Sequence, residues 1–150
     1  MSEKAKVGFV GTGVMGKSIV KHILSAGNEV TIYTRTKEKA QDLLNLGATW
    51  AESTGEVSAQ VEVIFTMVGY PSDVEEVYYG KTGIFENGKS NLIVIDLTTS
   101  TPTLAIELYN KAQAVGMSSL DAPVPGGDVG AKSGLLSILV GGDKEAFAKI

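Results

Sequence analysis

The residues best suited to chemistry form the segment 11–16, GTGVMG, which matches the pattern G-x-G-x-x-G. An apolar run that begins at Lys6 precedes it, and a helical pattern follows it. In this context the first glycine permits a tight turn, the second lets the backbone approach a pyrophosphate, and the third lets the helix pack closely on a sheet. The helix N-terminus also offers N–H groups and positive dipole charge to phosphates. The predicted cofactor residues here are Gly11, Thr12, Gly13, Val14, Met15 and Gly16.

A glycine-rich turn that binds no ligand is the alternative interpretation of this segment, since 18 of the 150 residues are glycine.

The end of the second predicted strand indicates which dinucleotide would bind. An NAD site usually has Asp or Glu at the end of the second strand, where it binds the ribose hydroxyls. This chain has Thr34, Arg35 and Thr36 instead. Arg can grip a 2′-phosphate with its planar fork of donors, whereas a carboxylate would repel it.

The predicted cofactor is therefore NADP, with NAD as the less favoured choice. The alternative is that Arg35 and the lysines after it are only the solvated start of the next helix.

Alternating strand and helix patterns must position these residues. The apolar and β-branched runs 29–34, 48–51, 61–68, 92–96, 119–124 and 135–140 predict strands, and 61–68 is continuous enough for a buried parallel strand. The helical patterns cover 14–26, 37–46, 54–60, 74–79 and 102–115, with Asp73 as a candidate N-cap of the fourth helix. Repeated βα units predict a doubly wound α/β fold, a mostly parallel sheet of the Rossmann dinucleotide-binding type with right-handed crossovers.

Composition narrows the class of protein. A length of 150 residues suits one dinucleotide-binding domain, 1–150, with a real core. The formal net charge of −4 argues against a nucleic-acid partner. The absence of cysteine excludes disulfides, thiolate catalysis and cysteine-ligated metal, and no metal site is expected. No apolar run approaches the ~20 residues of a membrane span. A cytoplasmic protein is the simplest expectation, and its oligomeric state, a homo-oligomer included, stays open.

Four segments together resemble the β-hydroxyacid dehydrogenases, the family of 3-hydroxyisobutyrate dehydrogenase and of glyoxylate and succinic semialdehyde reductases. The segments are GFVGTGVMG at 8–16, TRT at 34–36, FTMVGYPSDV at 65–74 and DAPVPGG at 121–127. The resemblance covers essentially the whole chain, in the family's order and spacing. It implies an NADP-dependent oxidoreductase that acts on small β-hydroxy acids or aldehyde acids.

The resemblance also implies individual roles. Thr34, Arg35 and Thr36 match the family's Asn-Arg-Thr element, which accompanies NADPH use, although Thr34 departs from the usual Asn. Met67 and Val68 would lie alongside the cofactor. Pro71 would close their loop, and Thr98 would approach the nicotinamide.

The DAPVPGG segment is the candidate site for a small carboxylate substrate. Gly126 and Gly127 leave backbone N–H groups bare, so they could bind the carboxylate with little steric hindrance. The family usually has Ser or Thr before this glycine pair, with a hydroxyl that touches substrate. This chain has Pro125 at that position, and proline has neither a hydroxyl nor a backbone N–H donor. The substrate's identity therefore stays open.

No catalytic residue is predicted within this chain. Hydride transfer to a carbonyl needs a proton donor, which the family takes from a lysine of a second, all-helical domain. No lysine here has a matching context, so we expect the cofactor half of an enzyme, inactive alone. The alternative from another class is a non-catalytic nucleotide-binding or sensing module. An S-adenosylmethionine methyltransferase is disfavoured, because its second strand should end in an acidic residue.

Overall fold

The computed structural model describes residues 5–11, 13–68, 71–98, 102–122 and 141–142. Its centre is a seven-stranded sheet in the order β3-β2-β1-β4-β5-β6-β7. Six strands are parallel, and β7 pairs antiparallel with β6. The strands are β1 (Lys6–Val10), β2 (Glu29–Tyr33), β3 (Thr49–Trp50), β4 (Val63–Thr66), β5 (Ile93–Asp96), β6 (Ser118–Asp121) and β7 (Gly141–Gly142).

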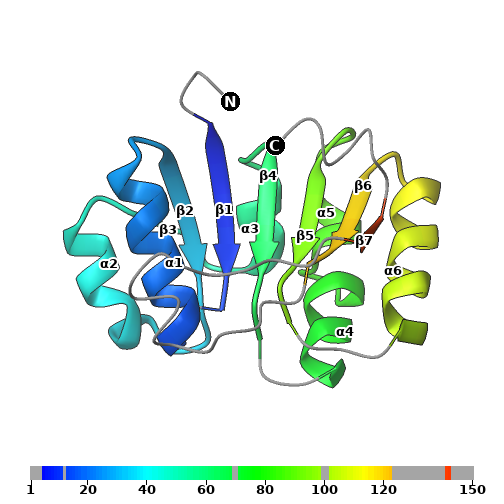
Figure 1. The fold of residues 1–150 in the computed structure, drawn as a ribbon, viewed down its shortest axis with the longest axis horizontal. Helices are drawn as coiled ribbons and strands as arrows, with labels where there is room; N and C mark the ends of the chain where they lie inside the picture. The colour runs from blue at the N-terminus through cyan, green and yellow to red at the C-terminus, as the bar shows by residue number, and fades with distance from the viewer. Residues whose placement is uncertain (1–4, 12, 69–70, 99–101, 123–140, 143–150) are drawn as a thin grey trace.

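Helices cover both faces of the sheet (Figure 1). They are α1 (Val14–Ser25), the 3-10 turn η1 (Lys37–Ala40), α2 (Gln41–Asn45), α3 (Thr54–Ser58), α4 (Pro71–Tyr79), α5 (Ile84–Asn87) and α6 (Pro102–Ala114). This arrangement confirms the doubly wound, mostly parallel α/β fold expected from the sequence.

Two apolar clusters hold the layers together. Successive residues of a strand point to opposite faces, so Phe9 joins one cluster while Val10 joins the other. The cluster containing Phe9 receives Val20 from α1 and Leu43 from α2. The cluster containing Val10 is covered by residues from α3, α4, α5 and α6. Strand β5 is buried along its whole length, which explains its continuous apolar sequence.

The boundaries differ from the sequence-based expectations in three places. The helix expected over 37–46 is divided into η1 and α2, and the short helix α5 was not predicted. Asp73 is not an N-cap, because α4 begins at Pro71 and places Asp73 in its first turn. Proline suits that first position, since its missing N–H would have no helical partner there. The strand expected at 135–140 lies outside the described residues.

The strand order creates the crevice that matters for function. The chain leaves β1 on one side to form β2 and β3, and returns on the other side to form β4. Ligands of open α/β sheets bind at such a switch point, outside the carboxyl ends of the strands. The ends of β1, β2, β4 and β5 all reach this edge, because the strands are parallel.

Candidate cofactor site

The glycine turn, residues 11–16, leaves the carboxyl end of β1. Gly11 has φ +94°, a conformation that side chains rarely adopt. A Cβ at Gly11 would also collide with the carbonyl oxygen of Met67. Its N–H donates to the carbonyl of Tyr33 at 3.0 Å, which ties the turn to the end of β2. Gly11 thus permits the tight turn that the pattern predicted, whereas Thr12 lies outside the described residues.

The other two glycines of the turn meet opposite surroundings. A Cβ at Gly16 would collide with the carbonyl oxygen of Gly11 and stand 3.1 Å from the ring of Phe9, so only glycine fits between α1 and the sheet. A Cβ at Gly13 would meet no atom of the described residues within 4 Å. Gly16 therefore serves helix packing, and the bare backbone of Gly13 faces open space into which a ligand could come.

Helix α1 begins directly beyond Gly13. The first bond of the helix runs from the N–H of Lys17 to the carbonyl of Gly13 at 2.8 Å. The N–H groups before it have no partner within an α-helix, so the helix presents donors and positive dipole charge at the turn. Met15 lines the cavity there. For Val14 the structure describes the backbone of the first helical residue and not its side chain.

Thr98 and Val68 are joined at what we call the β5 end of the site, lined by Met67, Val68 and Thr98. The hydroxyl of Thr98 accepts from the N–H of Val68 at 3.0 Å, and the N–H of Thr98 donates to Asp96 Oδ1 at 3.0 Å. The two loops that follow β4 and β5 are therefore fixed to each other. The hydroxyl of Thr98 also forms a hydrogen bond with Asp96, so its single hydrogen points toward that carboxylate.

A buried polar chain supports the β5 end from below. Thr66 donates to Asp96 Oδ1 at 3.0 Å and lies 2.9 Å from the hydroxyl of Tyr78 on α4. A threonine hydroxyl has one hydrogen, so Tyr78 must donate to Thr66. Asp96 is 3% exposed, and its Oδ2 has no hydrogen-bond partner among the described residues.

Burial raises the pKa values of Asp96 and Tyr78, two members of this hydrogen-bonded series. Burial raises the pKa of Asp96 above its ordinary value, and the charge of Asp121 on β6 adds to the rise. Hydrogen bonds from Thr98 and Thr66 act in the opposite direction and reduce the rise. Burial also raises the pKa of Tyr78 well above its ordinary value, so its hydroxyl keeps its proton.

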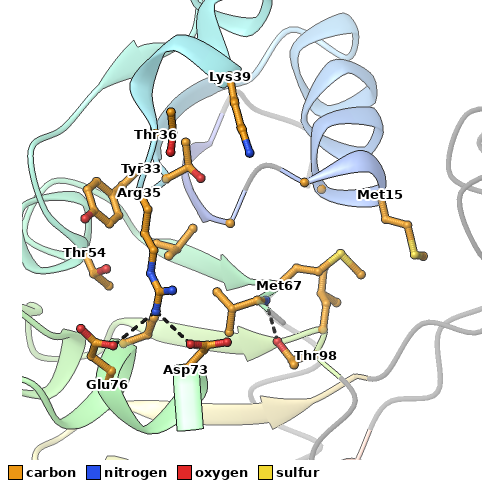
Figure 2. Close-up of a pocket in the computed structure, with 18 of the residues that line it drawn as sticks. Met15, Tyr33, Arg35, Thr36, Lys39, Thr54, Met67, Asp73, Glu76 and Thr98 are labelled. Carbon is orange, nitrogen blue, oxygen red and sulfur yellow. Dashed lines mark hydrogen bonds and ion pairs between the residues drawn. The ribbon is translucent and has the colours of Figure 1, made fainter. Parts of the chain in front are cut away.

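Arg35 and Lys39 mark the opposite end of the site, which we call the β2 end and which is lined by Thr34, Arg35, Thr36 and Lys39. Figure 2 shows Lys39 extending toward the glycine turn, while Arg35 reaches across to α4. There Arg35 Nη2 donates to Asp73 Oδ1 at 2.8 Å and to Glu76 Oε2 at 3.3 Å. Among the described residues, Lys39 makes no ion pair of this kind. The segment that follows β2 supplies cations and hydroxyls to the site, and α4 supplies carboxylates.

One cavity of about 700 Å³ joins both ends. This volume suits a cofactor-sized ligand. Ten of the predicted cofactor residues line it: Gly11, Gly13, Met15, Gly16, Thr34, Arg35, Thr36, Met67, Val68 and Thr98. The glycine turn, the start of α1 and the cations at the β2 end make the cavity fit a dinucleotide.

The side chains of the other predicted residues lie outside the described part of the structure. Pro71 begins α4, and only its backbone is described. Pro125, Gly126 and Gly127 lie outside the described residues. The lining also contains residues that the sequence analysis did not assign to a site, namely Val10, Tyr33, Lys39, Thr54, Asp73, Glu76, Val77, Thr82 and Leu97. Lys39 carried a signal, since it follows Thr36 by less than one helical turn, but Asp73 and Glu76 carried none.

Among the described residues, no group of three or more His, Cys, Asp or Glu side chains is placed to hold a metal ion. No described helix is long and apolar enough to cross a membrane.

Comparisons with known proteins agree with this geometry. Residues 6–150 match the family model of the NAD binding domain of 6-phosphogluconate dehydrogenase. The chain is 54% identical to the uncharacterized oxidoreductase YkwC of Bacillus subtilis over 144 residues, covering 96% of this chain and 50% of that protein. It is 45% identical to the probable 3-hydroxyisobutyrate dehydrogenase-like 1, mitochondrial, of Arabidopsis thaliana, covering 97% of this chain and 44% of that protein.

A solved structure of Psf3 in complex with NADP⁺ and 2-OPP superposes with a TM-score of 0.92 at 33% identity. The match covers 96% of this chain and 51% of Psf3. The chain thus spans about half the length of the curated relatives that it matches. By its matched model and its relatives, the chain belongs to the family of the 6-phosphogluconate dehydrogenase NAD-binding domain, among the 3-hydroxyisobutyrate dehydrogenase-type oxidoreductases.

Proposed function

We propose that this chain is the cofactor-binding part of an NADP-dependent oxidoreductase that acts on a small β-hydroxy acid or aldehyde acid. The observation that carries the proposal is the pair of cations, Arg35 and Lys39, at the β2 end of the cavity. The end of β2 contributes no carboxylate to bind ribose hydroxyls, and its hydroxyls and cations suit a 2′-phosphate. When bound, NADP(H) would supply the hydride.

Each part of the site has a task in this proposal. The start of α1 and the open backbone of Gly13 receive the pyrophosphate. Lys39 extends toward the glycine turn and acts as a point charge for the 2′-phosphate (Figure 2). At the other end, Thr98 is held by Asp96 and lines the part of the cavity that receives the nicotinamide. Met67 and Val68 present apolar surface beside the nicotinamide ring.

The substrate proposal rests on the family and on the sequence. Gly126 and Gly127 would bind a substrate carboxylate through their backbone N–H groups, with Pro125 shaping the approach. The Psf3 structure, which was solved with NADP⁺ and 2-OPP, supports a small-molecule substrate beside the dinucleotide. The net charge of −4 likewise supports a small-molecule partner over a nucleic acid. A cytoplasmic location and a homo-oligomer stay expectations of the same proposal.

Titration with NADPH and NADH tests the cofactor preference. The one tryptophan, Trp50, lies 5.7 Å from the ring of Tyr33, which lines the cavity, so its emission reports a bound reduced nicotinamide by energy transfer. NADPH should bind at least about tenfold more tightly, because a charge-assisted hydrogen bond contributes about 1.5–3 kcal/mol. Arg35→Ala and Lys39→Ala should each reduce that preference.

Lys111→Ala is the matched control, since Lys111 is an exposed cation on α6 that does not line the cavity. It should leave the ratio of the two affinities unchanged. Equal affinities for NADPH and NADH in the parent chain would contradict the NADP assignment.

A further inference from the structure

Arg35, one of the two cations proposed to bind the 2′-phosphate, already has partners. Arg35 extends from the end of β2 across the cavity, and Nη2 donates to both Asp73 and Glu76 on α4. Figure 2 shows the two carboxylates side by side below the guanidinium. All three side chains line the same cavity. A pair of ion bridges therefore connects two walls of the site where the β2 strand and α4 face each other.

The position of the two acids on α4 makes the contact a specific one. Asp73 and Glu76 are three residues apart, so they share one face of the helix. Asp73 is the closer partner, at 2.8 Å, and its side chain is only 20% exposed. Glu76 lies at 3.3 Å with a side chain 74% exposed. Asp73 should therefore dominate, with Glu76 as a weaker second partner, because solvent screens exposed charges.

The guanidinium of Arg35 cannot hydrogen-bond fully to a 2′-phosphate and to these carboxylates at the same time. The Nη2 group that the acids occupy belongs to the same planar fork that would grip a phosphate. Arg35 thus has two competing arrangements, one against α4 and one against the phosphate.

We propose that Asp73 and Glu76 are specificity-determining residues for the cofactor, which hold Arg35 against α4 and so weaken its preference for a 2′-phosphate. This inference rests on the proposed function, because it assumes that Arg35 meets the 2′-phosphate of NADP. NADH, which has no 2′-phosphate, leaves the bridges to α4 intact. The two acids therefore reduce the discrimination between the cofactors that Arg35 alone would give.

Calorimetric titration with two fragments tests the inference. The probes are adenosine 2′,5′-bisphosphate and adenosine 5′-monophosphate, which differ only in the 2′-phosphate. Asp73→Asn keeps the shape of the side chain and removes its charge. It should raise the affinity ratio of the bisphosphate to the monophosphate about two- to fivefold, the effect of one ion pair of this exposure. Glu76→Gln should raise the ratio less, and the double variant more than either.

Glu75→Gln is the matched control, because Glu75 is an exposed acid on the same helix that does not line the cavity. The change in net charge is the same, so the affinity ratio should stay at the parent value. The inference is overturned if Glu75→Gln raises the ratio as much as Asp73→Asn does. It is also overturned if removing the acids weakens both fragments together, since the acids would then be orienting Arg35 for the adenosine.

Two further outcomes separate this inference from the proposed function. If Arg35→Ala leaves the 2′-phosphate preference unchanged, the NADP assignment through Arg35 fails. If Arg35→Ala removes the preference but Asp73→Asn and Glu76→Gln do not alter it, only the present inference fails. In the Arg35→Ala background, Asp73→Asn should have no effect; a persistent effect would show direct repulsion of the phosphate and overturn the competition.

Discussion

The glycines of the turn at residues 11–16 show how identical residues carry different physical tasks. Gly11 is required by its positive φ, and Gly16 by the close approach of its own helix to the Gly11 carbonyl. Gly13 has ordinary extended backbone, with φ −68° and ψ −168°, and open space around it. Conformation and packing do not require glycine there, so the surrounding space is what a ligand would need.

Gly13→Val should therefore abolish cofactor binding while the free energy of unfolding stays within about 0.5 kcal/mol of the parent value. Its branched side chain would occupy the place of the pyrophosphate. Gly16→Val, the same change three residues later, should lower the free energy of unfolding by about 1–3 kcal/mol, because it overpacks the helix against the sheet. Urea unfolding and NADPH titration check both. If a folded Gly13→Val variant still bound NADPH tightly, the turn would have only a structural role and would not bind the pyrophosphate.

Asp96 carries a testable pH dependence. Its pKa is raised in the folded protein, mainly by burial, while an unfolded Asp titrates near its ordinary value of about 3.9. Between these two pKa values the folded state binds more protons than the unfolded state, so the free energy of unfolding falls as pH rises. The contribution is fully present below the unfolded pKa and is lost as pH rises through the folded pKa.

Asp96→Asn removes this titration. The free energy of unfolding of the parent minus that of the variant should be largest at acid pH and should decrease as pH rises through the elevated pKa. Urea unfolding of both proteins across pH 3.5–8 checks this, since other titrating groups cancel in the difference. A difference that is constant, or that increases with pH, would contradict the raised pKa.

At the scale of the elements, helix α4 joins the two ends of the site. Its buried Tyr78 anchors it to β4 through Thr66, and its acids Asp73 and Glu76 hold Arg35 beyond the end of β2. The same helix thus supports the loops at the β5 end and shapes the charge at the β2 end. Its position relative to the sheet sets the width of the cavity between them.

Tyr78→Phe should lower the free energy of unfolding by about 0.5–1.5 kcal/mol, the contribution of one net hydrogen bond. The ring remains packed in the core, and Thr66 still donates to Asp96, so the loss measures the anchor alone. Tyr79→Phe is the matched control, because Tyr79 is 41% exposed, and it should change the value by less than about 0.5 kcal/mol. Equal losses in the two variants would show that the bond to Thr66 does not hold the helix.

At the scale of the whole molecule, the parallel sheet gathers one end of each strand along a single edge. The cations of the described lining, Arg35 and Lys39, both belong to the β2 end of that edge. Neither a lysine nor a histidine lines the β5 end within the described residues, although hydride transfer to a carbonyl needs a proton donor there. The chain also spans about half of its curated relatives.

We therefore expect the 150-residue chain to bind NADPH without oxidising it in the presence of succinic semialdehyde or glyoxylate. A general acid commonly contributes 10²–10⁴-fold to such a rate. A chimera that joins this chain to the remaining half of the Bacillus subtilis relative, which is 54% identical over the matched part, should recover turnover. The measurement is loss of NADPH absorbance; rapid turnover by the chain alone would place the proton donor within it.

The sequence by itself determined the fold class and ten of the residues that line the cavity. These features can be recognised from short stretches of sequence: the periodicity of strands and helices, the glycine spacing of residues 11–16, and the ends of β2, β4 and β5. A parallel sheet then brings those strand ends together, so Gly13 and Arg35 could be assigned to one site from the sequence pattern. The family resemblance added Met67, Val68, Pro71 and Thr98 to the expected site, and the comparisons confirmed the family.

Only the tertiary structure decided which side chains are partners. Arg35 meets Asp73 and Glu76 across 38 and 41 residues, and Thr66 meets Asp96 across 30. No periodicity encodes such pairs, because they depend on how far α4 lies from the end of β2 and on which face of β4 turns inward. Helix boundaries were decided in the same way. The helix begins at Pro71, which turns Asp73 from a candidate cap into a partner of Arg35.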